Sequence, residues 1–336
     1  MSTPLISVQD LTVEIKTDRG LLKAVRGVSF DINPGDSIGI VGESGSGKSI
    51  TLKAILGLLP SNAHVSHGKV FIDGKDLSTH SQKSRRALLS NTTGMIFQDA
   101  IAALNPVIKV GAQIEEVPRF RIGKSKAEAR EIALTLMQKV GITDGESRFD
   151  LYPHQLSGGL RQRIAIAIAL SGSPKILFCD EPTTALDVTI QAQVLRLLKE
   201  LRINSGLGIV FVTHDLAVVN ELCDDIRVMY AGKFVESGTV SSTFKQPTHP
   251  YTFSLLKAAP DPDQPVHRLF SISGESPNPT LPVVSCPFVP RCFTATAQCQ
   301  ESEPELLPVG NSKSACFNSA NHSTWASEDS RNTPTR

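Results

Sequence analysis

Short apolar runs alternate with helix-like segments through the first three quarters of the chain. Residues 37–41, 175–179 and 208–212 are apolar runs of strand length, as buried strands are. Between residues 124 and 140 the apolar positions recur at three- and four-residue spacing, which predicts an amphipathic helix. Residues 5–15 partly alternate, which favours an edge or antiparallel strand. Because helical segments separate the buried strands, the predicted class is α/β with a largely parallel sheet.

The composition changes after residue 258. Eight prolines fall between residues 260 and 290, and neither a helix nor a central strand tolerates them well. We therefore predict a core domain over residues 1–258 and a small, irregular, Cys/Pro-rich domain over 259–325. The polar residues 326–336 are predicted to form a disordered tail.

A glycine-rich segment follows the first predicted buried strand. Residues 42–49 read GESGSGKS, which fits G-x-x-x-x-G-K-S/T between a strand and a helix. Such glycines let successive backbone N–H groups point at an anion, and the helix N-terminus adds its positive dipole end. A plain Gly/Ser-rich turn is the alternative. The predicted ATP-binding residues of this phosphate loop are Gly42, Glu43, Ser44, Gly45, Ser46, Gly47, Lys48 and Ser49.

A second acidic element follows a buried strand. Asp180 and Glu181 come directly after the apolar residues 176–179, at the strand end where α/β sheets place ligands. We expect Asp180 to orient Mg²⁺ through water and Glu181 to polarise the attacking water. The alternative is that Asp-Glu-Pro only closes the strand.

A third motif is more specific than these two. Residues 156–163 read LSGGLRQR and resemble the signature motif of ATP-binding cassette (ABC) ATPases. Further elements of that family appear in order, namely Gln98, the turn 184–187 and His214. The resemblance covers residues 5 to about 240.

This resemblance implies an ABC-type phosphate-loop ATPase core with a helical signature subdomain at about residues 99–172. It also implies a head-to-tail dimer with ATP between one phosphate loop and the opposing signature. The small residues 157–159 precede an apolar helix, so they form a second candidate anion site. The signature residues expected to face the opposing ATP are Ser157, Gly158, Gly159 and Gln162.

The resemblance also assigns roles within the cassette. Gln98 senses the γ-phosphate and joins Ser49 and Asp180 around Mg²⁺, while His214 hydrogen-bonds the γ-phosphate and attacking water. Lys48 reaches the β- and γ-phosphates. The expected cofactors are ATP and Mg²⁺, and the expected catalytic residues are Glu181, His214 and Lys48.

One feature departs from the family pattern. Residues 1–29 contain no Phe, Trp or Tyr, and Ile15 stands about where relatives often carry Phe. An aliphatic side chain can still bury the adenine, so the residue that contacts the base stays open.

Three further segments resemble one branch of the family. Residues 97–106 read FQDAIAALNP, residues 248–252 read THPYT, and residues 286–292 read CPFVPRC. They resemble segments of oligopeptide and dipeptide importers, with Ala100 in place of the usual proline. The implied function is that of an ATP-hydrolysing subunit that energises peptide import. This branch also serves nickel, haem and some sugars.

Location and partners follow from composition and from the resemblance. No apolar run approaches the roughly 18–20 residues that span a bilayer, and the N-terminus lacks a signal pattern. The net charge is +1, so it does not indicate nucleic acid. The resemblance implies a peripheral subunit at the cytoplasmic face of the bacterial inner membrane. Its partners would be a second, homologous ATPase, two permeases and, indirectly, a solute-binding protein.

A rival function is a soluble ABC ATPase of DNA repair or translation. Such proteins usually show two cassettes, long coiled-coil insertions or basic surfaces, and the sequence has none of these.

The six cysteines are unevenly distributed. Cys179 and Cys223 lie in apolar segments and are predicted core thiols. The other four are expected to bind metal, because cytosolic disulfides are rare. Their spacing matches neither common zinc pairs nor ferredoxin runs. The resemblance implies a 4Fe-4S cluster, with zinc or no metal as alternatives. The expected ligands are Cys286, Cys292, Cys299 and Cys316.

Overall fold

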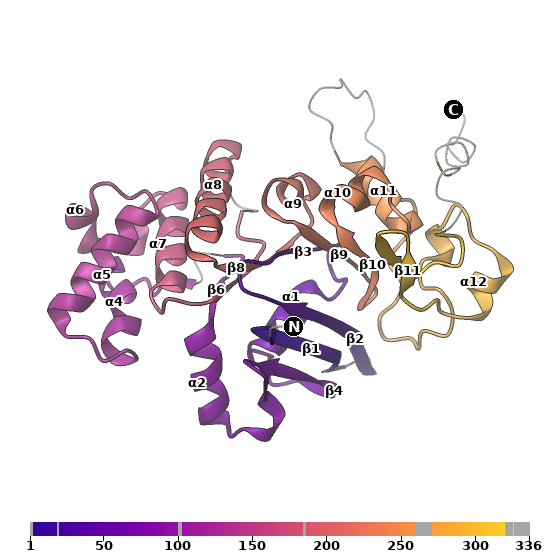
Figure 1. Cartoon of the computed structure of the whole chain (residues 1–336), viewed down its shortest axis with the longest axis horizontal. Coiled ribbons are helices and arrows are strands. Elements are labelled where there is room, and N and C mark those ends of the chain that lie inside the picture. The colour runs from indigo at the N-terminus through magenta and orange to yellow at the C-terminus, as the bar shows by residue number, and fades with distance from the viewer. Residues whose placement is uncertain are drawn as a thin grey trace. The chain divides into compact units, whose positions relative to one another are not determined.

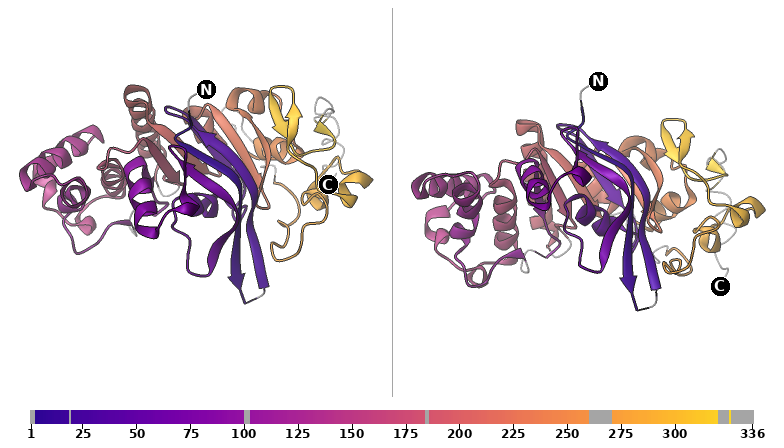
Figure 2. Two further views of the ribbon diagram at one scale, coloured as in Figure 1. Left: turned by 60° about the horizontal axis from the view of Figure 1, so that its bottom comes forward. Right: turned by 90° about the horizontal axis from the view of Figure 1, so that it is seen from below.

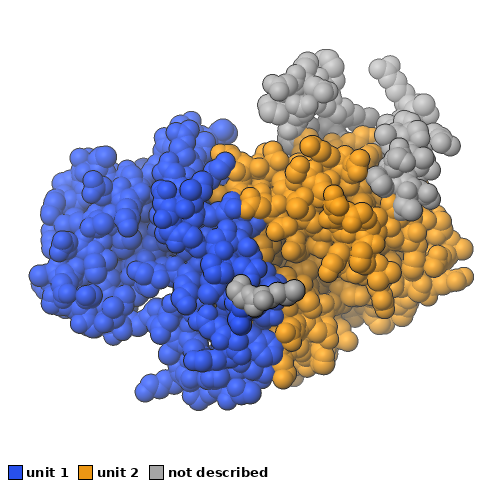
Figure 3. All heavy atoms as spheres, in the orientation of Figure 1, with its two compact units in different colours: residues 1–7, 31–37, 71–212 blue, residues 8–30, 38–70, 213–336 orange. Residues whose placement is uncertain are grey.

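The computed structural model describes residues 3–18, 20–99, 103–183, 186–259, 271–319 and 325. The chain divides into two compact units, which we describe separately (Figure 3). Unit 1 comprises residues 1–7, 31–37 and 71–212. Unit 2 comprises residues 8–30, 38–70 and 213–336. Among the described residues, no helix has both the length and the apolarity that a membrane span needs.

Unit 1 contains three parallel strands in the order β8-β7-β6. Their bounds are Gly208–Thr213, Ile176–Asp180 and Thr93–Ile96. All residues of β7 and β8 are buried, as their continuous apolar runs predict for strands covered on both faces. The strands predicted at residues 175–179 and 208–212 are therefore confirmed to within one residue.

The helices α4 to α7 gather together in unit 1 (Figure 1). The best predicted of them is α5 (Lys126–Lys139), which begins at a capping box. The hydroxyl of Ser125 accepts from the backbone N–H of Glu128, and the Glu128 carboxylate accepts from the backbone N–H of Ser125, so two helix-end donors are satisfied. The remaining elements of unit 1 are β5 (Lys75–Asp76), η1 (Leu77–Thr79), α2 (Gln82–Thr92), α4 (Val110–Phe120), α6 (Gly145–Phe149), η2 (Pro153–Gln155), α7 (Gly158–Leu170) and α8 (Val188–Ser205).

Unit 2 carries most of strands β1 (Ile6–Thr17), β2 (Gly20–Ile32) and β4 (Ala63–Ile72). They follow the order β2-β1-β4, and β1 and β2 lie side by side (Figure 2). The strand predicted at residues 5–15 is thus present.

A second group of strands in unit 2 has the order β11-β12-β10-β9-β3. Strand β3 runs parallel to β9, and the other neighbours are antiparallel. Every residue of β3 is buried, as its apolar run predicts. The bounds are β3 (Ser37–Val41), β9 (Asp225–Tyr230), β10 (Lys233–Thr239), β11 (Leu307–Val309) and β12 (Ser312–Ser314).

The described residues after 271 contain little regular structure and belong to unit 2. They pack on it through aromatic rings, because Phe288 lies edge-on to Tyr230 and Tyr251 with centroids 5.3 and 5.4 Å away. The helices of unit 2 are α1 (Lys48–Ile55), α9 (Leu216–Leu222), α10 (Val240–Lys245), α11 (Pro250–Ala258), η3 (Val289–Arg291) and α12 (Ala297–Glu301).

Two predictions about organisation stay predictions. The boundary at residues 258/259 is one of them, because unit 2 contains residues from both sides of it. The disordered tail over residues 326–336 lies outside the described residues.

Candidate functional site

The phosphate loop in unit 2 requires glycine at two positions. Gly42 has a φ of 155°, and a Cβ there would lie 2.2 Å from the backbone oxygen of Met229. Gly47 has a φ of 109°, and its Cβ would lie 2.5 Å from the oxygen of Ala24. Both positions combine an unfavourable backbone conformation for other residues with a close backbone approach. The loop then enters α1 at Lys48, as the motif predicts.

Side chains of the phosphate loop are arranged around its backbone. The Lys48 ammonium is buried and donates to the backbone oxygens of Gly42 and Glu43, at 2.8 and 2.9 Å. The buried Ser46 hydroxyl has no hydrogen-bond partner among the described residues. A cation and an unsatisfied hydroxyl beside backbone N–H groups fit an anionic ligand.

Two residues hold the phosphate loop from outside, and their role was missed at the sequence level. The Tyr251 hydroxyl accepts from the backbone N–H of Glu43 at 2.8 Å. The Arg291 guanidinium donates to both carboxylate oxygens of Glu43 at 2.7 and 2.8 Å. Both residues lie in segments already noted as typical of peptide importers, but nothing in the sequence indicated their contact with this loop.

In unit 1 the end of β7 presents the predicted carboxylates. Asp180 is the last residue of the strand and is only 4% exposed. Glu181 follows with a φ of 47°, a strained value for a residue with a side chain, and its N–H donates to the Val212 oxygen at 2.9 Å. The Gln98 amide donates to the Glu181 carboxylate at 3.4 Å. The structure therefore brings together Gln98, which is predicted to sense the γ-phosphate, and Glu181, which is predicted to polarise the attacking water.

The signature segment, also in unit 1, begins α7. Ser157 and Gly158 are exposed, and the Ser157 hydroxyl accepts from the Leu160 N–H as the N-cap. A Cβ on Gly159 would lie 3.0 Å from Ile190. Gln162 is only 3% exposed, so it belongs to the packed side of α7, away from the exposed start of the helix.

The other predicted residues take different positions. His214 is exposed and follows β8. Ile15 is half-buried in β1. In the segment 97–106, Leu104 is buried, while residues 100–102 lie outside the described residues, as do residues 184 and 185 of the turn after Glu181.

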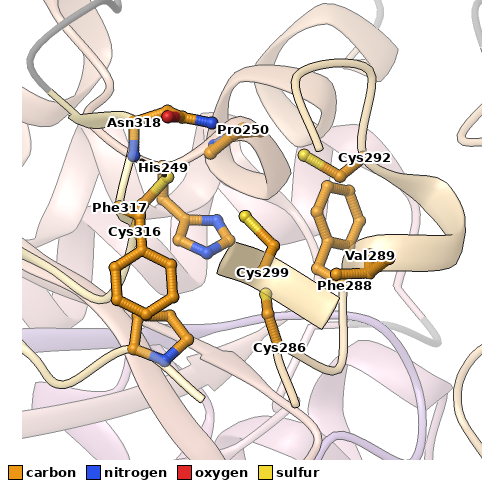
Figure 4. Close-up of a pocket in the computed structure, with 11 residues that line it drawn as sticks. His249, Pro250, Cys286, Phe288, Val289, Cys292, Cys299, Cys316, Phe317 and Asn318 are labelled. Atoms are coloured by element: carbon orange, nitrogen blue, oxygen red, sulfur yellow. Dashed lines mark hydrogen bonds between the residues drawn. The ribbon is translucent and has the colours of Figure 1, made fainter. Parts of the chain in front are cut away.

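The four C-terminal cysteines line one pocket in unit 2 (Figure 4). The Cys286 backbone N–H donates to the Cys299 oxygen at 3.0 Å. The sulfur of Cys316 accepts from the Asn318 N–H at 3.3 Å. No group of three or more metal-ligating side chains in the described part of the chain is placed to hold a metal ion. The pocket is otherwise lined by His249, Pro250, Phe288, Val289, Pro304, Phe317 and Asn318.

Burial controls the protonation of three of these thiols. It raises the pKa of Cys286 to about 11 and of Cys316 to about 12, and it raises the pKa of Cys292 as well. The charges of neighbouring cysteines raise the values further. The thiols of Cys286, Cys292 and Cys316 are therefore neutral at pH 7, and a bound metal would have to displace their protons. The predicted core thiols Cys179 and Cys223 are both buried.

Comparison with protein families gives two matches along the chain. The ABC transporter model matches residues 25–184. The oligopeptide/dipeptide transporter C-terminal region matches residues 235–299, which include three of the four pocket cysteines.

Known proteins match over most of their length. The dipeptide transport ATP-binding protein of Haemophilus influenzae is 43% identical over 317 residues, covering 94% of this chain and 96% of the relative. The protein of the same name from Escherichia coli is 45% identical, covering 90% and 92%. Among solved structures, a dimeric ATP-binding cassette with bound ADP and Pi aligns at a TM-score of 0.63 and 28% identity, covering 70% of this chain and 98% of that one.

These matches confirm the predicted ABC-type α/β cassette and the prediction of an ATPase. The cassette model covers the phosphate loop and the signature, and the C-terminal model begins shortly after β9. The chain therefore belongs to the family of ABC transporter ATPases, in the branch that carries the oligopeptide/dipeptide transporter C-terminal region.

Proposed function

We propose that this chain energises the import of dipeptides or oligopeptides through an ABC transporter. The observation that carries the proposal is the match of nearly the whole chain, including its C-terminal region, to proteins named for dipeptide transport. A cassette alone serves many cargoes, whereas the family model that matches this C-terminal region is named for oligopeptide/dipeptide transporters.

The motif series and the local geometry support the catalytic residues that we propose. Lys48 and the backbone N–H groups of the phosphate loop bind the phosphates, and Ser49 and Asp180 would hold Mg²⁺ together with Gln98. When bound, Mg²⁺ neutralises the charge that develops on the phosphate oxygens. Glu181 accepts the proton of the attacking water, and the amide of Gln98, 3.4 Å away, orients that carboxylate.

His214 is proposed to stabilise the γ-phosphate and the water by hydrogen bonding. Its exposed position at the end of β8 is compatible with a ligand contact.

The exposed surfaces of unit 1 support the proposed partners. The start of α7 presents Ser157 and Gly158 to solvent, so a second, homologous ATPase subunit is proposed to place its own ATP there. Two permeases would contact the segment from Gln98 to Pro106, which is flanked by Phe97, 41% exposed, and Val107, 78% exposed. The subunit would then work at the cytoplasmic face of the inner membrane, with an extracytoplasmic solute-binding protein as an indirect partner.

The permease contact has a direct test. Val107→Asp should lower ATP hydrolysis that is coupled to transport, while the ATP affinity of the isolated subunit stays unchanged. Ile203→Asp is the matched control, because Ile203 is also exposed, at 70%, and lies on α8. Equal effects of the two substitutions would argue against a specific contact.

For the pocket cysteines, we propose a 4Fe-4S cluster bound by Cys286, Cys292, Cys299 and Cys316. The support is that all four thiols line one pocket with apolar surroundings and that sulfur accepts hydrogen bonds there, as from the Asn318 N–H. Four thiolates are the ligand set of such clusters. The cluster would supply cohesion to a region with little regular structure of its own.

The function is tested by reconstituting the subunit with its permeases and binding protein in proteoliposomes. Dipeptides or oligopeptides should stimulate ATP hydrolysis and accumulate inside. If nickel, haem or a sugar stimulated ATP hydrolysis and peptides did not, the chain would still be a transporter ATPase, but peptides would not be its substrate. An ATPase that binds no permease would support the rival soluble function.

A further inference from the structure

Arg291 connects the cysteine-rich region to the phosphate loop. It lies between Cys286 and Cys292 in sequence, and its guanidinium makes a two-pronged contact with Glu43, 248 residues earlier. The two nitrogen–oxygen distances are 2.7 and 2.8 Å. A fork of this kind fixes direction as well as charge, which a lysine cannot do.

Arg291 is itself held in place. Its side chain is only 4% exposed. Its Nε donates to the Ser273 oxygen at 3.1 Å, and its guanidinium carbon lies 5.9 Å from the ring centres of Tyr230 and Phe288. An arginine fixed by packing loses little further freedom when it binds a carboxylate. It can therefore act as a rigid support.

Glu43 links Arg291 to the residues that are proposed to bind phosphate. Its backbone oxygen accepts from the Lys48 ammonium at 2.9 Å and from the Ser46 N–H at 3.2 Å. Its backbone N–H is held by Tyr251, and Ser276 donates to its carboxylate at 3.2 Å. A displaced Glu43 would thus alter the position of Lys48 and the curvature of the loop.

The contact also has an electrostatic consequence. Glu43 places a carboxylate within the loop that is proposed to receive a triphosphate, and the Arg291 contact lowers the pKa of that carboxyl group. Without a cation beside it, this fixed negative charge would repel the phosphates.

We propose that Arg291 is a positioning residue of the phosphate loop, which makes the ATP affinity of the cassette depend on the C-terminal region. The proposal rests on the proposed function, in which this loop binds ATP. It assigns to Arg291 a role in nucleotide binding exerted through Glu43.

A double-mutant cycle on the full chain tests the proposal. ATP affinity is measured for the wild type, Arg291→Gln, Glu43→Gln and the double variant. Arg291→Gln should weaken binding about tenfold, as the loss of a charge-assisted contact does. In the Glu43→Gln background, the same substitution should have little further effect, because the group through which Arg291 acts is already neutral.

Control variants separate this role from a purely structural one. Glu303→Gln breaks the comparable two-pronged contact of the C-terminal region with Arg26, at 2.8 and 3.1 Å, and should leave ATP affinity unchanged. Arg291→Lys should bind ATP more tightly than Arg291→Gln but more weakly than the wild type. If Arg291→Gln does not fold, Arg291→Lys takes its place in the cycle. Lys48→Ala tests the loop itself, so its failure to weaken binding would overturn the proposed function.

Three results would overturn the inference while Lys48→Ala still weakens binding. The first is an unchanged affinity in Arg291→Gln. The second is full additivity of the two single substitutions. The third is an equal loss of affinity in Glu303→Gln, which would show a general loosening of the C-terminal region.

Discussion

In the part of the chain that the structure describes, the helices α1 and α7 both begin at glycine-rich segments, and these two helix N-termini differ in how much of the molecule supports them. At α1 the phosphate loop is held by the Tyr251 hydroxyl, by the Arg291 guanidinium and by its own Lys48. At α7 a Cβ on Gly158 would have nothing within 4 Å, and Ser157 is exposed.

The comparison shows that the same local chemistry is used in two ways. Both segments offer N–H groups and a dipole end to an anion. The segment at α1 is supported from within unit 2, whereas Ser157 and Gly158 at the start of α7 are exposed to solvent. This difference favours an arrangement in which α7 meets a nucleotide bound by another subunit.

The largest effect should come from abolishing hydrolysis while both helix N-termini stay intact. Glu181→Gln should lower turnover by about 10²–10⁴-fold, because the water loses its general base. Binding of ATP should persist, since the phosphate contacts are unchanged. Steady-state ATPase rates and equilibrium binding of the assembled transporter measure both quantities.

Glu200→Gln is the control for this prediction, because it neutralises an exposed carboxylate on α8 and should leave turnover unchanged. Wild-type rates in the Glu181→Gln transporter would remove Glu181 from catalysis.

The second prediction separates the two helix N-termini. Gly158→Asp should fold, because the added side chain enters open space and an acid suits the first turn of a helix. In the assembled transporter it should reduce turnover about 10²-fold, as the loss of a transition-state contact does. The affinity of this chain's own phosphate loop should not change.

Gly158→Ala adds no charge and should have a much smaller effect than Gly158→Asp. If Gly158→Asp weakened ATP binding to the isolated subunit, the distinction between the two segments would be wrong.

The third prediction concerns the cysteine pocket, which lies in unit 2 together with the phosphate loop. Cys292→Ala should lose the iron, which anaerobic purification and iron analysis would show as a drop from about four irons per chain. Thermal unfolding of unit 2 should begin several degrees lower, because each 1 kcal/mol shifts Tm by about 2–4 °C in a domain of 150–250 residues.

Cys223→Ala is the control. Cys223 is also buried, but it lies far from the four pocket cysteines in the sequence and is not a proposed ligand. Stoichiometric zinc without iron in the wild type would replace the cluster with a zinc site.

The smallest effect is the pH dependence of the Arg291 contact. The pKa of Glu43 lies below its ordinary value of 4.5, chiefly because Arg291 donates hydrogen bonds to it. The contact therefore stabilises the fold fully above pH 4.5, and this contribution is lost as the pH falls through the lowered pKa.

Denaturant unfolding of the wild type and Arg291→Gln should show this dependence. We expect a difference of about 1 kcal/mol at pH 7, since the pair is partly exposed. The difference should shrink as the pH falls below 4.5. If the difference in unfolding free energy stayed constant across this pH range, the stability lost in Arg291→Gln would not depend on the ionisation of Glu43.

The sequence predicts well those elements that depend on local patterns. Strand β3 was predicted at its observed bounds, and the bounds of α5 were predicted to within two residues. Both depend on residues that are close together in the sequence, namely an apolar run for β3 and a capping box for α5. The helix predicted after the phosphate loop is α1, and it ends at Ile55, shortly before Gly57, which takes a left-handed φ of 67°.

What the sequence could not predict depends on residues far apart in the chain. The pairing of Glu43 with Arg291 needs the folded C-terminal region, and no local pattern indicates it. The burial of Gln162 likewise depends on which side of α7 packs. The motif identifies the segment, but packing decides which of its side chains reach solvent.

A crosslink at the exposed signature tests most directly whether the start of α7 meets a nucleotide bound by another subunit. In assembled transporters, a cysteine placed by Gly158→Cys is paired with a cysteine in the phosphate loop of the second ATPase subunit. With an added mild oxidant to take up the two electrons and two protons of the thiol pair, a disulfide should form between the two subunits when ATP is present and should not form when ATP is left out. A crosslink that forms equally well without ATP would contradict this arrangement. So would the absence of a crosslink to any phosphate loop, provided that Lys48 is still needed for ATP binding.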